Sequence, residues 1–472
     1  MKKALFLAAA LALSAVAVAL AYQAAARERD YRAELTRGDA ALRDEQTFGA
    51  IEAYSGAIAL RPDSMLPHLR RGETYQRRGE LDEAARDFRA AATLDPTATR
   101  PLEALGDVLY QLKRFERAAE TYTRNLRVDD RSTGVSYKLA LARYRSGDID
   151  AALAALASTL RLNDRLPDAT YLRGLCLRDK HRTGDALEAF KRTVALAPDH
   201  IAAREELADL YGSTGRHDEE IEQLQMMAGL DRDHVERQVA LGLAQARAGH
   251  EELAVLTLGS ALERTPGQPF VYRALGQVWL DRAQAHNDRV YLSKALEALG
   301  RGASSPDATS DILTLYGRAL LLDEQFDAAE RALQQASTRH PLEPASLVLY
   351  ATVAEQQGHL DAGRQALIDY AGLVADDADA TAHAARIAVL SVKLNDSPTA
   401  VSWLEHALRM VPDDVRLLAQ LADAQIRAGD SSAAQATIAR GLEKDPANRE
   451  LRALSRRAQS GSGLKAHGLS NP

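Results

Sequence analysis

A motif of thirty-four residues recurs along this chain, and it is clearest between Met65 and Ala98, which read MLPHLRRGETYQRRGELDEAARDFRAAATLDPTA. One alanine of the motif returns at this spacing, and the series passes through Glu220 and Gly363 in place of alanine. The alanines are Ala50, Ala84, Ala118, Ala152, Ala186, Ala254, Ala295, Ala329, Ala400 and Ala434. A period of this length indicates a stack of small repeated units rather than a chain folded around one core.

Each copy of the motif contains two stretches with apolar residues at helical spacing, and short helices of this kind are stable only when packed. Gly72 and Ala84 fall in the middle of the two stretches, where small side chains let two helix backbones approach closely. Gly79 lies between the stretches and suits a left-handed helix cap. Pro96 follows the second stretch and ends it, because proline has no amide hydrogen. We therefore expect two helices per copy, stacked against the next copy.

The prolines test this register. Seven of the fifteen lie between successive copies: Pro62, Pro96, Pro198, Pro266, Pro341, Pro412 and Pro446. Another five fall in the first turn of the helix that follows, where a missing amide hydrogen costs little: Pro67, Pro101, Pro167, Pro269 and Pro344. The register therefore predicts no proline inside a helix.

The period, the small residues at fixed places and the proline between copies resemble the tetratricopeptide repeat (TPR) family. The resemblance implies an all-α fold, a TPR α-solenoid in which helix-turn-helix repeats form a right-handed superhelix. We assign the chain in this order: repeats 1 to 8 over residues 31–309, repeats 9 to 12 over 310–448, a polar capping helix over 449–459 and a disordered tail over 460–472.

Two irregularities interrupt the period. Seven extra residues lie around Ala283 to Arg289, in repeat 8, and a smaller slip of three residues lies near Val374 to Ala380. Each is either a hinge or an insertion tolerated in a surface loop.

The first segment, residues 1–26, differs from the rest of the chain. Lys2 and Lys3 precede an apolar run, and the next charge is Arg27. The run is either a cleavable signal peptide, with small-residue sites such as Ala19-Leu20-Ala21, or a membrane anchor just long enough to span the hydrocarbon core. Both alternatives predict that the repeats are exported, to the periplasmic side of a bacterial inner membrane if anchored, or as a soluble periplasmic or secreted protein if cleaved.

Composition and motifs exclude several functional classes. The formal net charge of −7 is mild and mixed, which gives no support for nucleic-acid binding. The single cysteine, Cys176, lies in an apolar stretch and is expected to be a buried small hydrophobe. The sequence contains none of the common catalytic or nucleotide-binding motifs, and its histidines are scattered singly. We therefore predict a non-enzymatic protein without a metal or another cofactor.

The resemblance also implies a binding site. In the TPR family, the first helices of the repeats line a concave groove, through the second, fifth, ninth, twelfth and thirteenth places of each repeat. In repeats 3 to 5 these places and their neighbours hold aromatic and basic residues, the usual composition of binding hot spots. They are Tyr110, Tyr137, Lys138, Tyr144, Arg145, Tyr171 and Arg178. The alternative is that the rings are packing spacers between repeats.

Elsewhere the groove places are less distinctive. None of them holds asparagine, which argues against the carboxylate clamp of chaperone-binding members of the family. In repeats 9 to 12 they hold mostly small residues: Thr314, Arg318, Val348, Thr352, Ala385, Val389, Ala419 and Asp423. We therefore expect an exported scaffold that binds envelope proteins through a peptide or helix in the groove and assists assembly or secretion machinery. The alternative function is a structural assembly factor that acts by self-association of its repeats.

Overall fold

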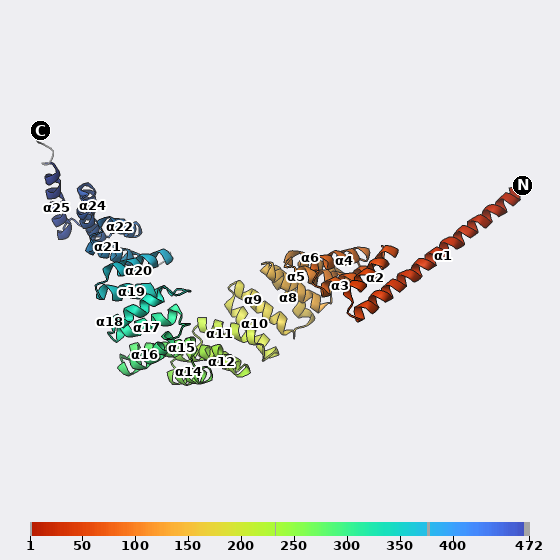
Figure 1. Ribbon diagram of the computed structural model, residues 1–472, viewed down its shortest axis with the longest axis horizontal. Helices are drawn as coiled ribbons and strands as arrows, with labels where there is room; N and C mark the ends of the chain where they lie inside the picture. The colour runs from red at the N-terminus through yellow and green to blue at the C-terminus, as the bar shows by residue number, and fades with distance from the viewer. Residues whose placement is uncertain (1, 232, 375–377, 467–472) are drawn as a thin grey trace. The chain divides into compact units, whose positions relative to one another are not determined.

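The computed structural model describes residues 2–231, 233–374 and 378–466, which form twenty-five α-helices and no strand (Figure 1). The expected all-α fold of stacked helical repeats is confirmed. The chain divides into two compact units, residues 1–216 and 217–472, and each is described by itself.

The helices of the first unit are α1 (Lys2–Arg43), α2 (Thr47–Leu60), α3 (Met65–Arg77), α4 (Leu81–Leu94), α5 (Thr99–Gln111), α6 (Phe115–Val128), α7 (Thr133–Arg145), α8 (Ile149–Leu162), α9 (Pro167–Asp179), α10 (Thr183–Leu196) and α11 (Ile201–Ser213).

The helices of the second unit are α12 (His217–Leu230), α13 (Val235–Arg247), α14 (Glu251–Arg264), α15 (Pro269–His286), α16 (Arg289–Ala303), α17 (Ser310–Leu322), α18 (Phe326–Ala336), α19 (Ala345–Gln356), α20 (Leu360–Leu373), α21 (Ala380–Lys393), α22 (Ser397–Met410), α23 (Val415–Arg427), α24 (Ser431–Lys444) and α25 (Arg449–Ala466).

Within each unit, every helix packs against the next one in the chain, so that the buried apolar residues form a continuous series of small cores. The odd-numbered helices are the first helices of the repeats, and several also touch the first helix of the next repeat, as α3 touches α5 and α15 touches α17. We call the side of the stack formed by the odd-numbered helices the first-helix face. No described proline lies inside a helix beyond its first turn.

A glycine under a large side chain sets the distance between the two helices of a repeat. A Cβ atom placed on Gly72, Gly106 or Gly174 would come within 2.8, 2.4 and 2.4 Å of the rings of Phe88, Tyr122 and Phe190, respectively. Real Cβ atoms do not approach that closely, so the ring occupies the space that a side chain on the first helix would need. The pair recurs as Gly38 under Tyr54, Gly242 under Leu258, Gly276 under Leu299 and Gly317 under Leu333.

The turn between the two helices of a repeat contains one residue in the left-handed backbone conformation. Glycine occupies it in six repeats: Gly79, Gly147, Gly215, Gly249, Gly358 and Gly429. Residues with a side chain occupy it in the other six: Glu45, Lys113, His181, Asn287, Glu324 and Asn395. The turn geometry is therefore retained even where the residue is not the one that favours it.

We expect the change His181→Gly to increase the free energy of unfolding by up to about 1 kcal/mol, because His181 has φ 56° and L residues are strained there. The opposite change at the same place of the preceding repeat, Gly147→His, should destabilise by a similar amount, since Gly147 has φ 82°. Urea denaturation followed by circular dichroism measures both effects. Equal midpoints for wild type and His181→Gly would contradict the argument.

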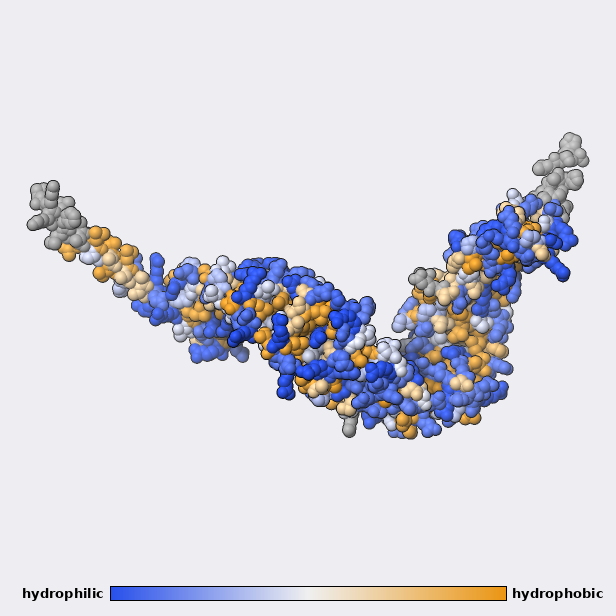
Figure 2. Space-filling model, turned by 180° about the vertical axis from the view of Figure 1, so that it is seen from behind, coloured by the Kyte–Doolittle hydropathy of each residue, from blue (hydrophilic) through white to orange (hydrophobic). Residues whose placement is uncertain are grey.

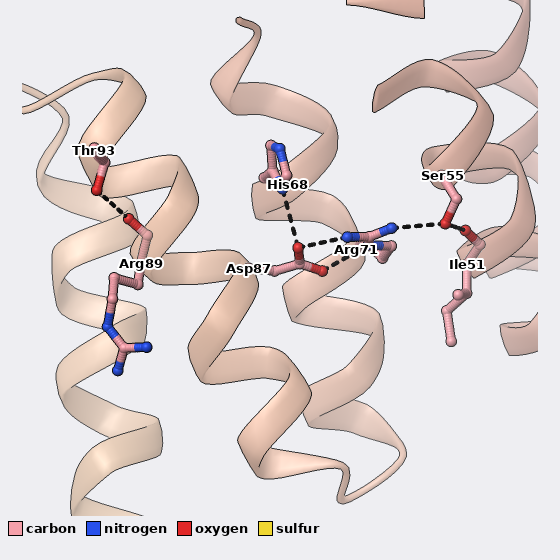
Figure 3. A network of polar contacts seen from close by, with 7 residues as sticks. All are labelled: Ile51, Ser55, His68, Arg71, Asp87, Arg89 and Thr93. Carbon is pink, nitrogen blue, oxygen red and sulfur yellow. Dashed lines mark hydrogen bonds and ion pairs between the residues drawn. The ribbon is translucent and has the colours of Figure 1, made fainter. Parts of the chain in front are cut away.

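A network of buried charged and polar side chains crosses α2, α3 and α4 (Figure 3). Asp87 is only 4% exposed and accepts two hydrogen bonds from Arg71, at 2.7 and 2.8 Å. Its Oδ1 also lies 3.0 Å from Nδ1 of His68. The third nitrogen of Arg71 donates to Oγ of Ser55 at 2.8 Å, and Ser55 donates to the carbonyl oxygen of Ile51 at 2.7 Å. Three helices from two repeats are thus joined through one carboxylate.

The expected insertion in repeat 8 is not a loop. Helix α15 has eighteen residues where α13 has thirteen, so most of the extra residues continue the helix, which ends at His286 before a left-handed Asn287. Alanine, arginine and glutamine in this stretch are good helix formers, which explains the continuation. The second irregularity falls between α20 and α21, and its residues 375–377 lie outside the described residues.

The last helix of the chain is longer than the sequence predicts. Helix α25 continues to Ala466, seven residues beyond the predicted capping helix, and no proline lies between Pro446 and Ala466 to stop it. The remaining part of the expected tail, residues 467–472, lies outside the described residues. Leu451, Leu454 and Ala458 of α25 are buried, and Arg452 and Arg456 are exposed, which is the division expected of a cap.

Helix α1 runs without a break from Lys2 into the first repeat (Figure 1). Its first buried side chain in the described set is Tyr31, whose hydroxyl lies 2.8 Å from Oγ of Ser64. The apolar side chains before it are exposed, Leu13 by 72% and Val18 by 68%, and they form the orange end of α1 in Figure 2. Among the described residues, no helix combines the length and the hydropathy needed to cross a membrane.

Candidate partner-binding site

The four tyrosines predicted as a binding surface lie on α5, α7 and α9 of the first unit, and all four are half-buried. Tyr110 packs edge-to-face on Phe115, with ring centroids 5.2 Å apart. Burial raises the pKa of Tyr137 to about 12, with smaller contributions from the nearby Asp168 and Tyr110. Tyr110 and Tyr137 thus both pack against neighbouring side chains, each beside a different core cluster.

The other two tyrosines contact neighbouring helices of the same or the next repeat. Tyr171 lies 5.8 Å from the ring of Phe190 and 4.7 Å from the ring of His200. Burial raises the pKa of Tyr144, and a hydrogen bond to Asp179 raises it further. All four rings thus serve in inter-helix packing, as the spacer interpretation expects, and each also keeps an accessible surface, as the binding interpretation requires.

Two of the three predicted basic residues are already paired with carboxylates of neighbouring repeats. Lys138 lies 2.8 Å from Glu103 and 2.7 Å from Asp107. Burial would lower the pKa of its ammonium group, but these two carboxylates hold the pKa above its ordinary value. Such a cation links α7 to α5 and is already neutralised.

Arg178 is engaged in the same way. Its Nη1 lies 2.5 Å from Oε1 and 2.6 Å from Oε2 of Glu206 on α11, and its Nη2 lies 3.0 Å from Asp179. Arg145 is exposed, and no ion pair with a described residue is formed by it. Of the three predicted cations, only Arg145 is therefore available as an unpaired charge.

The sequence analysis missed the carboxylates that hold these cations. Asp107 accepts a hydrogen bond from the hydroxyl of Tyr122 at 2.7 Å in addition to its ion pair with Lys138. The same arrangement recurs in repeat 1, where Tyr54 donates to Asp39 at 2.7 Å and Arg70 lies 4.0 Å from Asp39. The available signal was an acidic residue at the ninth place beside an arginine or lysine in the next repeat.

The first-helix face of the second unit is hollowed, which the sequence analysis did not foresee. A cavity of about 640 Å³ is lined by residues of α15, α17, α19, α20 and α21, among them Thr314, Arg318 and Val348. Another of about 550 Å³ lies at α21, α23 and α25 and includes Val389 and Asp423. A third, of about 270 Å³, lies between α13, α14 and α15. The small groove residues that looked undistinguished in the sequence are those that leave this space open.

The single cysteine and the metal-ligating side chains bear on whether this face has a reactive centre. Cys176 is fully buried, and burial, with a contribution from Asp179, raises the pKa of its thiol to about 12, so the reactive thiolate is disfavoured. No group of three or more His, Cys, Asp or Glu side chains in the described residues could hold a metal ion. The arrangement offers half-buried rings, paired charges and hollows, which suit contact with another chain.

Stacked helix pairs with an accessible first-helix face define a helical-repeat scaffold. Sequence models described as tetratricopeptide repeat match residues 69–128, 137–199, 177–235, 315–380 and 393–458, which together cover more than half of the chain. The chain belongs to the tetratricopeptide repeat family. No curated protein matches it.

Several solved structures are similar to parts of the chain. YrrB, described as a TPR protein with an unusual peptide-binding site, is 21% identical, with 40% of this chain and 97% of that chain covered and a TM-score of 0.35. MamA from Desulfovibrio magneticus RS-1 is 21% identical, with 36% and 96% covered and a TM-score of 0.34. A tetratricopeptide repeat protein from Parabacteroides merdae is 16% identical, with 53% and 99% covered and a TM-score of 0.38.

Proposed function

We propose that this chain is an exported, non-enzymatic scaffold that binds a segment of a protein partner along its first-helix face. The observation that carries the proposal is that the half-buried tyrosines of the first unit and the three hollows of the second unit lie on this one kind of surface. A scaffold needs no catalytic group, and accessible aromatic rings provide contact area at small entropic cost.

The charges around the tyrosines indicate how the partner is held in repeats 3 to 5. Lys138 and Arg178 are each neutralised by carboxylates of this chain, so a partner's carboxylate would have to displace them. The half-buried Leu141 and Leu175 lie among the same rings. The surface therefore suits apolar side chains of the partner, with the tyrosine hydroxyls as hydrogen-bonding groups, and binding there should depend only weakly on salt.

Export is proposed from the first segment. The exposed apolar end of α1 fits either a signal sequence that is removed or an anchor that is retained. Both place the repeats among envelope proteins, where a scaffold would assist assembly or secretion machinery. Cell fractionation with a high-salt wash, followed by amino-terminal sequencing of the recovered chain, separates the alternatives. Recovery of the chain with its first segment in the cytoplasmic fraction would overturn export.

The test of the binding surface compares the wild type with a variant in which Tyr110, Tyr137, Tyr144 and Tyr171 are all alanine. Each is used as bait in an envelope extract, and circular dichroism checks that both are folded. We expect at least one partner to be recovered with the wild type and lost by about tenfold or more with the variant, because central aromatic residues carry most of the binding energy of an interface.

A matched control replaces Tyr272, Tyr316 and Tyr350, which are half-buried tyrosines of other first helices that lie outside the groove places. This control loses comparable packing and should keep its partner. If the four-alanine variant recovers the same proteins as wild type, the tyrosines are spacers. A mass in solution that rises with concentration, without any other partner, would favour self-association instead.

A further inference from the structure

The extra turn of α15 builds part of the first-helix face of the second unit. In this turn, Arg282 lies 2.7 Å from Oε2 of Glu251 on α14, and its guanidinium stands 4.3 Å from the ring centroid of Tyr291 on α16. Oε1 of Gln284 accepts a hydrogen bond from Arg318 on α17 at 2.6 Å. The inserted residues therefore connect repeat 8 to both neighbouring repeats rather than interrupting the stack.

Two of the hollows meet at this helix. Gln277 of α15 lines both the cavity of about 270 Å³ on the α13 side and the cavity of about 640 Å³ on the α17 side. The first has apolar walls that include Leu243 and Val278, and the second has Leu315 and Val348. Together they form a depression along repeats 7 to 10, with a combined lining from α13, α14, α15, α17, α19, α20 and α21.

The cations around this depression already have partners. Arg282 is paired with Glu251, Arg247 with Glu220, and Arg273 lies 3.2 Å from Asp311. Each of these pairs consumes one positive and one negative charge. The remaining arginine of the lining, Arg318, is hydrogen-bonded to Gln284. Three further carboxylates also line the two hollows, so the lining as a whole holds no excess of positive charge: Asp281, Glu343 and Asp379.

Asp281 is a carboxylate of the smaller hollow that takes no part in these pairs. It lines the smaller hollow at the start of the extra turn and forms no ion pair with a described residue. The nearest cation that acts on it is Arg318, whose guanidinium is bound to Gln284. Asp281 is exposed, and partial desolvation beside the hollow raises the pKa of its carboxyl, an effect that Arg318 opposes. The carboxylate is therefore short of a positive partner.

We propose that this depression binds a protein segment with a lysine or arginine beside apolar residues, whose basic group lies against Asp281. The apolar walls would take the neighbouring side chains, and the carboxylate would select the charge. This inference rests on the proposed function, because it names the kind of segment that the first-helix face accepts.

The test screens the full-length protein against a positional-scanning peptide library at low and at physiological salt. We expect wild type to select lysine or arginine at one position next to aliphatic residues, with a preference of about two- to fivefold, the size of one exposed charge pair. Asp281→Asn should lose the basic preference and keep the aliphatic one. Asp281→Lys should select aspartate or glutamate at the same position.

Asp209 provides the matched control, since it is an exposed aspartate on the first-helix face of α11, away from the depression. Asp209→Asn removes the same charge and should leave the selection unchanged. Peptides bound by wild type without a basic preference, or a preference that survives Asp281→Asn, would overturn the inference while leaving the proposed function intact. If no peptide binds at all, the proposed function fails, and the inference fails with it.

Discussion

Replacing Asp87 by alanine should lower the free energy of unfolding of the repeats around it by about 3–5 kcal/mol, the usual cost of breaking a buried ion pair from one side. The change leaves the half-buried guanidinium of Arg71 with Ser55 as its remaining partner in the network. It also removes the acceptor of His68. The measurement is hydrogen exchange of the α3 and α4 amides, supported by urea denaturation, because an array of repeats can open locally before it unfolds as a whole.

The neighbouring repeat supplies the control for this prediction. Thirty-four residues later, the places of His68, Arg71 and Asp87 are held by Leu102, Leu105 and Thr121. The triple variant His68→Leu, Arg71→Leu, Asp87→Thr removes all three network members and should recover most of the loss, since a buried ion pair replaced by apolar groups is often neutral. If Asp87→Ala were as stable as wild type, the network would not be buried and paired as described.

The same network gives a pH dependence. Burial would raise the pKa of the Asp87 carboxyl, but the hydrogen bonds from Arg71 and His68 hold it below its ordinary value. A carboxyl with a lowered folded pKa contributes stability above its unfolded pKa, at about 3.9, and loses that contribution as the pH falls through the folded value. The free energy of unfolding of wild type should therefore fall, relative to that of the triple variant, as the pH drops below about 4.

The second large effect is expected at Gly174. A Cβ on this residue would lie 2.4 Å from the ring of Phe190, which is fully buried and cannot move aside without disturbing its neighbours. Alanine gains about 1 kcal/mol of helix propensity over glycine, and over-packing costs about 1–3 kcal/mol, so we expect Gly174→Ala to destabilise by up to about 2 kcal/mol net. Urea denaturation of the single variant gives the value.

A second substitution distinguishes over-packing from other causes. Repeat 4 has Ala140 and Leu156 at the corresponding places, and both are fully buried in one core cluster. The double variant Gly174→Ala, Phe190→Leu should therefore lose less free energy of unfolding than the two single variants together, by about 1 kcal/mol or more. Additive single effects would show that the ring and the glycine are not packed against each other.

Much of the fold follows from the sequence because each repeat encodes its own local geometry. Gly79 adopts the left-handed conformation of the turn, and Pro96 lies between two repeats. Gly72 makes room for Phe88. These residue types recur at fixed offsets, so a pattern read from one repeat can be applied to the others. The insertion near Ala283 was the exception. Its extra residues could not be placed from the period, which says where a copy is too long but not whether the surplus is helix or loop.

The binding surface was less predictable, for two physical reasons. Lys138 was recognised as basic and accessible, but its pairing with Asp107 depends on how the next repeat is set against the last, thirty-one residues away in the sequence. The hollows of the second unit are lined in part by aliphatic residues such as Val389, which do not stand out as binding residues in the sequence. The register still held information about Asp87, since an acidic residue stands there at a place where the next repeat has Thr121.

The fitted pairs of glycine and ring have a consequence for how such a chain can lengthen or shorten. Removing α9 with α10, or α8 with α9, deletes the same amount of sequence and keeps the period. The first deletion removes Gly174 together with Phe190, which are packed against each other. The second removes Gly174 but keeps Phe190, whose ring would then have to pack against the methyl group of Ala140 on α7. A duplication or deletion therefore preserves the packing when it contains both helices of one repeat. Where it begins and ends matters as much as its length.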